Sequence, residues 1–302
     1  MSQPASALHR EHHLAPFIAV TLGIALFSVM DGLMKSASLA AGAYSAMLLR
    51  SIFGTALMYP VWKWREGTWP SRSLMKLHAL RGAVSGAMAT SFFAGLVYLP
   101  MAEGIALSFI APLIALYLAA VMLGEKIGGR AILASVLGLA GVAVIAAARL
   151  GDAELGDNAA WGIGMILFSA VLYAWNLILQ RRQALLAGPA EVAFFQTVFV
   201  ALFLGLAAPW LAVMPPPAAL RDIFAGAVLA MLSLMVISWG YGRAEAQALL
   251  PIEYTAFIWA AIMGWLMFGE ALTLPTVIGV ALIVIGCWIA APRKSHIEQT
   301  AL

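Results

Sequence analysis

The chain has 302 residues, of which 63% are hydrophobic and only 10% are charged, and its mean hydropathy is +0.95. Soluble domains carry about a quarter of their residues as charged side chains, so this composition excludes a soluble enzyme or binding module. The net charge of +3 by itself is compatible with a negatively charged partner such as a nucleic acid.

Ten apolar runs follow one another along the chain. They cover approximately residues 15–35, 43–64, 76–98, 101–123, 129–148, 159–181, 190–212, 221–242, 246–268 and 272–291. Each has about the 20 residues that a helix needs to cross the hydrocarbon core. Backbone polar groups in lipid must be satisfied within the segment, so every run is predicted to be helical. The connecting loops are too short for a soluble domain. The predicted fold class is an all-α membrane protein with ten transmembrane helices.

The first run has a second interpretation, because "SASLAAG" after it could be the cleavage site of a signal peptide. Asp31 and Lys35 argue against this, since a cleaved segment is normally uncharged at such positions. We therefore expect residues 15–35 to be a retained helix.

The basic residues gather on one side of the predicted membrane. If the N-terminus is cytoplasmic, the inner side receives Arg10, Lys63, Arg65, Arg72, Lys76, Arg81, Lys126, Arg130, Arg181, Arg182, Arg243, Arg293 and Lys294. The outer loops keep only Arg149 and Arg221, with Lys35 and Arg50 near the outer helix ends. This is the positive-inside pattern, which predicts a multi-pass protein of a bacterial inner membrane with both termini cytoplasmic. It also argues against a nucleic-acid partner.

The two halves of the chain carry related motifs. "VMLGEK" (121–126) recurs as "LMFGEA" (266–271), which places Glu125 and Glu270 in register 145 positions apart. Gly141 falls on Gly286 at the same offset. A repeat of five helices is odd in number, so the second copy enters the membrane in the opposite sense, with Glu125 inside and Glu270 outside. Inverted repeats around a central cavity are typical of secondary transporters.

The predicted organisation follows from this repeat. A disordered tail (1–14) precedes the first five-helix repeat (15–150), which is followed by the inverted second repeat (151–291) and a C-terminal tail (292–302). The two glutamates of the motif are interpreted as interfacial residues that mark where a helix ends.

The repeated unit resembles the EamA family of the drug/metabolite transporter superfamily. The resemblance lies in "PIEYTAFIWAAIMGWLMFGEALTLPTVIGVALIVIGCWI" of the second half and in "LLRSIFG" of the first. It implies a basket of helices around a central cavity, with the fifth and tenth helices packed outside. Within the superfamily the chain is similar to bacterial exporters of aromatic amino acids and metabolites.

Three acidic or basic residues within the spans are candidates for substrate binding or coupling. Glu253 either faces a cavity two turns into the ninth span or is a first-turn acid stabilised by the helix dipole behind Pro251, and the sequence leaves both open. Asp31 and Arg50 lie near the outer ends of the first two spans, with Lys35 one turn from Asp31. Arg50 could hold a substrate carboxylate and Asp31 an ammonium group or a proton. Alternatively, the three charges compensate one another and fix helix one against helix two.

Aromatic residues supply the other substrate candidates, because their faces stack on planar groups and attract ammonium groups. The predicted cavity residues are Tyr254, Phe257 and Trp259 of the ninth span, Tyr173, Trp175 and Asn176 of the sixth, Trp239 of the eighth, Phe109 of the fourth and Tyr98 at the end of the third. Six further tryptophans are expected in the interfacial belts, namely Trp62, Trp64, Trp69, Trp161, Trp210 and Trp288.

The sequence lacks the parts of an enzyme. The five histidines are predicted to be terminal or interfacial, which leaves no mid-membrane base or metal ligand, and no phosphate-binding loop is present. No cofactor is implied.

The predicted function is a monomeric secondary transporter in the lipid bilayer, exporting amino acids and related small metabolites by alternating access. Proton-coupled efflux of cationic drugs, with Glu253 or Asp31 as the buried anion, is the alternative within transport. A receptor or scaffold without net flux is the alternative outside it.

Overall fold

The computed structural model describes residues 6–65, 67–123, 129–150, 156–243, 249 and 252–290. All regular secondary structure in these ranges is helical. The predicted C-terminal tail (292–302), Glu125, Lys126 and Pro251 lie outside the described residues.

The described part of the first half contains six helices with the bounds α1 (Ser6–Ala41), α2 (Ala43–Arg65), α3 (Arg72–Leu96), α4 (Met101–Ser108), α5 (Ala111–Leu123) and α6 (Gly129–Leu150). The described part of the second half contains α7 (Gly156–Ala184), α8 (Pro189–Gly205), α9 (Ala208–Leu211), α10 (Pro217–Tyr241), α12 (Ala256–Phe268) and α13 (Leu274–Ala290). α1 begins inside the segment predicted to be a disordered tail, because residues 6–15 contain neither glycine nor proline to stop the helix.

Two of the predicted spans are interrupted at related positions. The run 101–123 breaks at Phe109 and Ile110, between α4 and α5, and α12 is preceded by a turn at Tyr254 and Thr255. The two breaks are 145 positions apart, which is the offset of the repeated motif. Both turns use hydrogen bonds over three residues, Phe109 N to Ala106 O at 3.2 Å and Thr255 N to Ile252 O at 2.9 Å. Pro112 contributes to the first break because it has no N–H for the Ser108 carbonyl.

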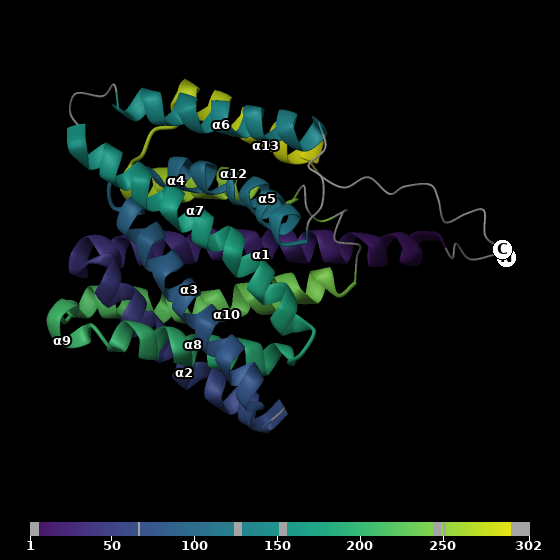
Figure 1. Ribbon diagram of the computed structural model, residues 1–302, viewed down its shortest axis with the longest axis vertical. Coiled ribbons are helices and arrows are strands. Elements are labelled where there is room, and N and C mark those ends of the chain that lie inside the picture. Colours follow the sequence, from purple (N-terminus) through teal and green to yellow (C-terminus); the bar gives the residue numbers. More distant parts are fainter. Residues whose placement is uncertain are drawn as a thin grey trace.

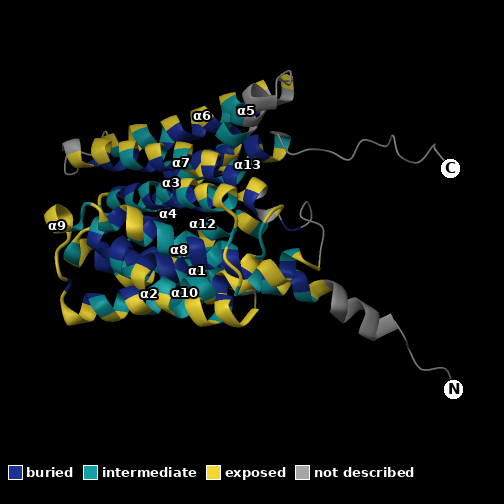
Figure 2. Ribbon diagram, turned by 60° about the horizontal axis from the view of Figure 1, so that its bottom comes forward, coloured by how far each residue is buried: buried dark blue, intermediate teal, exposed yellow. Residues whose placement is uncertain are grey.

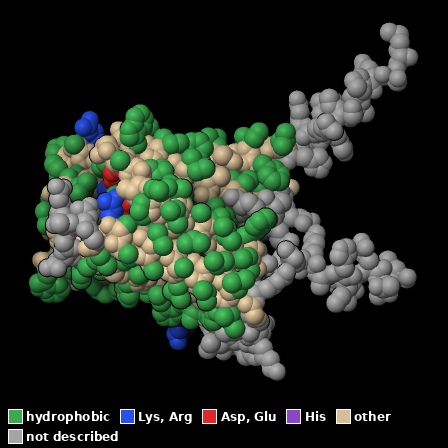
Figure 3. All heavy atoms as spheres, turned by 90° about the horizontal axis from the view of Figure 1, so that it is seen from above, with side chains coloured by type: hydrophobic (Ala, Val, Ile, Leu, Met, Phe, Trp, Pro, Cys, Tyr) green, Lys and Arg blue, Asp and Glu red, His purple; other side chains and the backbone are tan. Residues whose placement is uncertain are grey.

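Among the described helices, four are long and apolar enough to cross a membrane by length and composition, namely Leu14–Ala41, Ile132–Leu150, Asn158–Gln180 and Pro217–Tyr241. Shorter apolar helices cover Met101–Ala115, Pro189–Gly205, Ala256–Phe268 and Leu274–Ile289. Hydrophobic side chains cover most of the face drawn in Figure 3, as expected for a surface in contact with lipid. The molecule is therefore a multi-pass helical membrane protein.

The tryptophans predicted for the interfacial belts divide into two groups. Five of them, Trp64, Trp69, Trp161, Trp210 and Trp288, are exposed. Trp62 is only 2% exposed, because its ring stacks on Phe194 with the centroids 4.7 Å apart and also contacts Phe195. Trp62 therefore packs α2 against α8, and its assignment to the belt was wrong.

The helices pack in antiparallel pairs joined by glycines. In the pair α1 and α10, Gly23 lies against Ile237 and Gly240 lies against Val20. In the pair α3 and α7, a methyl group on Gly95 would lie 2.6 Å from the carbonyl oxygen of Gly162. α6 and α13 form a third pair at one edge of the molecule (Figure 1). Small residues let these backbones approach closely, which is how membrane helices pack without a hydrophobic driving force.

The pairs enclose two large apolar cores, and the buried residues of the interior are dark blue in Figure 2. One core lies among α1, α2 and α3 and includes Met30, Met34 and Met47. The other lies among the interrupted helices, α6, α7 and α13, and includes Leu107, Ile166 and Ile283.

Candidate functional site

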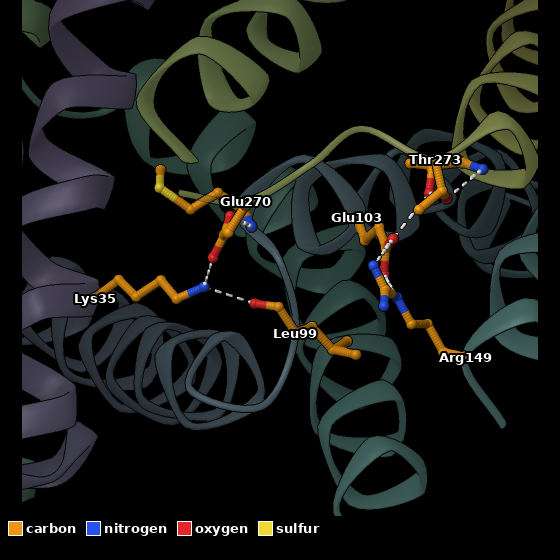
Figure 4. Close-up of polar contacts among 8 residues, drawn as sticks. Lys35, Leu99, Glu103, Arg149, Glu270 and Thr273 are labelled. Carbon is orange, nitrogen blue, oxygen red and sulfur yellow. Dashed lines mark hydrogen bonds and ion pairs between the residues drawn. The ribbon is translucent and has the colours of Figure 1, made fainter. Parts of the chain in front are cut away.

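A buried ion pair joins the two halves of the chain. Lys35 of α1, 4% exposed, donates to Glu270 Oε1 and also to the carbonyl oxygen of Leu99 at 2.7 Å (Figure 4). The other oxygen of Glu270 accepts from the Met101 backbone N–H at 2.7 Å. Gly269, with φ of +67°, ends α12 in a left-handed turn and so directs Glu270 back toward α4.

This geometry corrects two expectations. Glu270 does not simply mark the end of a helix at the interface, because its side chain is only 16% exposed and is bonded to α1 and α4. Lys35 does not compensate Asp31 on its own helix, because its ammonium group is bonded to Glu270.

A second buried carboxylate lies beside the first. Both oxygens of Glu103, at the start of α4, accept from Arg149 at 2.6 Å, and Thr276 Oγ1 donates to Oε1 at 2.8 Å. Figure 4 shows this group next to the Lys35–Glu270 pair, with the N-terminal turn of α4 between the two carboxylates. A small cleft lined by Pro100, Ala102, Glu103, Ala261, Glu270, Ala271 and Leu272 lies at the same place. The start of α4 is thus tied to α1, α6 and α13 by charged side chains.

The predicted charges Asp31 and Arg50 face each other without forming an ion pair. Asp31 is 8% exposed, and among the described residues no hydrogen bond reaches its carboxylate. Arg50 extends from α2 to α1, where its Nη1 lies 3.9 Å from the sulfur of Met30. Arg50 Nε is buried with no described hydrogen-bond partner.

Three predicted aromatic residues meet where the interrupted helices cross. The rings of Phe109 and Tyr254 are in edge contact with centroids 5.4 Å apart, and Phe257 packs on the same core. Phe109 and Tyr254 are related by the repeat offset of 145 positions. They therefore occupy equivalent places in the two halves and lie at the centre of the contact between them.

Glu253 lies in a different polar group. It precedes α12, in the short helical segment before the Tyr254–Thr255 turn, and its carboxylate accepts from the hydroxyl of Tyr241 at the end of α10. Tyr173 of α7 is 39% exposed and lies within electrostatic range of Glu253. Glu253 is exposed, and Arg243 is occupied elsewhere, with its guanidinium 4.2 Å from the ring centroid of Trp239.

The remaining aromatic candidates are dispersed. Trp175 shares an exposed stripe of α7 with Phe168 and Val171, which are seven and four residues before it. Trp259 packs against the N-terminal part of α1 in the cluster of Val20 and Leu249. Tyr98 is exposed in the connection between α3 and α4. The structure thus brings Tyr254, Phe257 and Phe109 together and separates them from Trp175, Trp239 and Trp259.

Asn176 belongs to a buried network between α3, α7 and α8. Its amide oxygen accepts from Arg81 Nε at 3.2 Å and from Ser85 Oγ at 3.0 Å. Arg81 also donates to Gln183, which is bonded to His78, and His78 lies 3.0 Å from Glu191. His78 is fully buried within this network. All of these side chains hold α3 against α7 and α8.

Replacing Asn176 with leucine is expected to destabilise the protein, because it leaves the buried Arg81 Nε and Ser85 hydroxyl without their acceptor. A buried donor without a partner costs about 1–3 kcal/mol, and more when it is charged. Thermal unfolding in detergent would measure the loss. Asn176→Asp is the matched control, since it keeps the accepting oxygen and should retain more of the stability than Asn176→Leu. Equal losses in both variants would contradict this assignment.

Sequence reasoning missed the partners of these charges. An ionisable residue inside a membrane span is expected to face the protein interior and to be paired, which was a usable signal for Lys35 and Arg81. The partner of Lys35 is 235 positions away, and nothing in the local pattern around either residue identifies it.

The comparisons with known proteins agree with this architecture. The model of the EamA-like transporter family matches the chain twice, over residues 14–147 and 160–291. The pseudopaline exporter CntI of Pseudomonas aeruginosa is 25% identical over 264 residues, covering 86% of this chain and 90% of the exporter. An uncharacterized transporter of Helicobacter pylori is 25% identical over 276 residues, covering 88% of this chain and 91% of its own length. A solved crystal structure, described only as that of a protein, aligns with a TM-score of 0.61 at 20% identity, over 91% of this chain and 96% of the other.

The fold and the buried charges define a polytopic membrane protein with two related halves. The double match over most of the chain shows that it belongs to the EamA-like transporter family, as the repeated motifs predicted. The protein is a membrane transporter, and its substrates are small molecules.

Proposed function

We propose that this protein is a secondary transporter that exports amino acids and related small metabolites across the bacterial inner membrane. In this proposal the chain crosses the membrane ten times, as two inverted five-helix repeats (15–150 and 151–291), with both termini cytoplasmic. α4 with α5 would form the fourth span, and the segment ending in α12 the ninth. The transporter would work as a monomer by alternating access.

The packing of α6 against α13 is the observation that carries the proposal. A methyl group on Gly141 would lie 2.4 Å from the Gly279 carbonyl oxygen, and one on Gly286 would lie 2.7 Å from the Ala134 carbonyl oxygen. Adding the repeat offset of 145 positions converts Gly141 to Gly286 and Ala134 to Gly279. The first contact is therefore converted into the second when the two halves are exchanged. Because the two helices run in opposite directions, this exchange supports halves that are inverted in the membrane.

Alternating access requires that one side of the molecule be closed while the other opens. In the proposed orientation, the Lys35–Glu270 pair and the Glu103–Arg149 pair lie on the outer side and hold the start of α4 to α1, α6 and α13. Glu253, Tyr241 and Tyr173 then lie on the inner side, where Tyr173 and Glu253 are exposed. This distribution supports an inward-facing state in which the outer side is closed.

Export of small metabolites is supported by the relatives. One of them is named as an exporter, and the matched regions cover most of both chains. The substrate class rests on two charges of the interior, the buried carboxylate of Asp31 and the partly buried guanidinium of Arg50.

Flux in proteoliposomes tests the proposal. Purified protein is reconstituted with a radiolabelled amino-acid panel on one side, with and without an imposed pH gradient. We expect uptake above that of empty liposomes. Tyr254→Ala should reduce it, because the variant removes the ring that meets Phe109 where the halves cross. Trp161→Ala is the matched control, since Trp161 is exposed on α7 and should leave uptake unchanged.

Four outcomes discriminate among the candidate functions. Uptake that needs no gradient supports facilitated exchange, and uptake that follows the gradient supports proton coupling. Transport of cationic drugs but of no amino acid would replace the proposal by drug efflux. Binding without any flux by the folded protein would replace it by a receptor or scaffold.

A further inference from the structure

Asp31 and Arg50 are two charges of opposite sign within the helices, the first buried and the second partly buried, and they share no hydrogen-bonding partner. The carboxylate accepts no hydrogen bond among the described residues, and the guanidinium has only the weak contact with the Met30 sulfur. An isolated charge is costly to bury, and two opposite charges in reach of each other would ordinarily close into a direct pair. Here the two groups form no ion pair with each other.

The two groups lie at comparable depth beneath the Lys35–Glu270 pair. α1 and α2 are joined at Gly42, whose φ of +79° makes the tight turn between them. Asp31 is about 16 Å and Arg50 about 12 Å from this turn, measured along their helix axes at 1.5 Å per residue. Lys35 is one turn nearer to Gly42 than Asp31 on the same face of α1. A molecule held between Asp31 and Arg50 would therefore lie beyond Lys35, on the side away from Gly42.

Neither side chain is completely enclosed, since Asp31 is 8% exposed and Arg50 is partly exposed. Among the described residues, no group donates a hydrogen bond to the Asp31 oxygens, yet these oxygens are not fully enclosed. Arg50 Nε, in contrast, is fully enclosed. The Arg50 side chain as a whole is only partly buried. The carboxylate therefore keeps some accessible surface, whereas Arg50 Nε has almost none.

A zwitterion satisfies both charges at once. Its carboxylate can accept two parallel hydrogen bonds from a guanidinium, which is the strongest common pairing of these groups, and its ammonium group can donate to Asp31. An amine without the acid would leave Arg50 unpaired, and an acid without the amine would leave Asp31 unpaired. Each of those ligands would therefore bind more weakly than the molecule that carries both groups.

Two aromatic residues lie beyond Asp31 and Arg50 along their helices, on the side away from Lys35. Phe27 lies one turn beyond Asp31 on the same face of α1, and Phe53 lies one turn beyond Arg50 on α2. Both pack against the apolar core of this half, and Phe53 is in edge contact with Phe224 of α10 at 5.5 Å between centroids. An apolar or aromatic side chain of the ligand would contact this surface.

We propose that Asp31 and Arg50 form a split binding site for zwitterionic α-amino acids, in which the Arg50 guanidinium binds the carboxylate and Asp31 binds the ammonium group. The inference rests on the proposed transport function, because it names the groups that select the substrate. The experiment below measures binding alone, so that it succeeds or fails independently of flux.

Binding to the purified full chain in detergent is compared for three molecules with the same ring. L-phenylalanine carries both charges, 2-phenylethylamine only the ammonium group and 3-phenylpropionate only the carboxylate. We expect L-phenylalanine to bind to the wild type about tenfold or more tightly than either analogue, since a hydrogen bond to a charged group is worth a factor of about ten or more. This comparison uses no variant, so it does not depend on whether a variant folds.

Substitutions then assign each charge. Arg50→Gln should weaken 3-phenylpropionate and L-phenylalanine and leave 2-phenylethylamine unchanged. Asp31→Asn should weaken 2-phenylethylamine and L-phenylalanine and leave 3-phenylpropionate unchanged. Arg221→Gln and Asp222→Asn are matched controls on α10, where Asp222 accepts from Ser36 at 2.9 Å, and neither should change any of the three affinities.

The opposite results overturn the inference. It fails if the wild type binds either analogue as tightly as L-phenylalanine, or binds none of the three. It also fails if folded Arg50→Gln and Asp31→Asn proteins, eluting as single species, retain wild-type affinity for L-phenylalanine. A transporter that moves amino acids but shows no such selectivity would keep the proposed function and lose this site. A protein that binds with this selectivity but catalyses no flux would keep this site and lose the proposed function.

Discussion

Replacing Lys35 with methionine is expected to cause one of the largest losses of stability available to a single substitution in this protein. The variant leaves the Glu270 carboxylate without its cation, while the Met101 N–H continues to hold it in place. Removing one partner of a buried ion pair costs about 3–5 kcal/mol, mainly because the remaining charge stays buried and unpaired. Unfolding in a detergent titration would measure the loss.

The same substitution is expected to open the molecule near α4. A reporter cysteine at Ala102, which is 6% exposed in the cleft beside Glu270, is introduced after Cys287, the chain's single cysteine, is replaced with serine. In the Lys35→Met background the reporter should react faster with a membrane-impermeant maleimide. Reaction from the periplasmic side would also support the proposed orientation, and reaction only from the cytoplasmic side would contradict it.

The double variant Lys35→Met/Glu270→Gln separates the two effects. Because neither charge remains, most of the lost stability should return, as is common when a buried pair is replaced as a whole. The reporter should nevertheless stay reactive, since the link between α1 and α12 is still missing. If Lys35→Met alone alters neither stability nor labelling, the ion pair does not hold this side closed.

Replacing Gly141 with leucine is expected to separate α6 from α13. Even the first carbon of the new side chain would lie 2.4 Å from the Gly279 carbonyl oxygen and 2.6 Å from the Ile283 side chain. Backbone cannot yield as a flexible side chain can, so we expect a loss near or above the usual limit of about 3 kcal/mol for overpacking. The thermal midpoint in detergent measures it.

Two further leucine variants serve as controls for this prediction. Gly286→Leu places its first carbon 2.7 Å from the Ala134 carbonyl oxygen, in the contact related to that of Gly141 by exchange of the halves, so it should lower stability by a similar amount. Gly164→Leu on α7 has no atom within 4 Å of its first carbon and should be close to neutral. A large loss for only one of the two paired glycines would argue against equivalent packing in the two halves.

The helical nature of the spans could be predicted from the sequence because the membrane leaves few alternatives. A run of about 20 apolar residues in lipid can satisfy its backbone only as a helix, whatever its neighbours are. Family membership was also accessible, since the repeated Gly-Glu motif and the glycines at the same offset are local features. The interruptions at Phe109 and Tyr254 were missed. A continuous apolar run does not indicate where the backbone changes from i to i−4 hydrogen bonds to i to i−3 hydrogen bonds.

The candidate site depended on information that a one-dimensional pattern does not hold. The prediction grouped the aromatic residues of three spans, but the structure separates Trp175 and Trp239 from Tyr254, because each side chain's direction depends on how its helix is rotated against its neighbours. The spans themselves have weak amphipathic patterns, since lipid and protein interior are both apolar, and so the sequence shows poorly which face is buried.

The composition and order of the residues therefore determined that the protein lies in a lipid bilayer, that its spans are helical, that it has two related halves and that it belongs to the transporter family. Each of these follows from local chemistry or from motifs repeated at one offset. Only the tertiary structure decided the partners of the buried charges. Lys35 meets Glu270, and Glu103 meets Arg149, because antiparallel packing brings distant helix ends to one place. The tertiary structure also decided that Asp31 and Arg50 form no ion pair with each other. This depends on the spacing of α1 and α2 and not on either sequence segment alone.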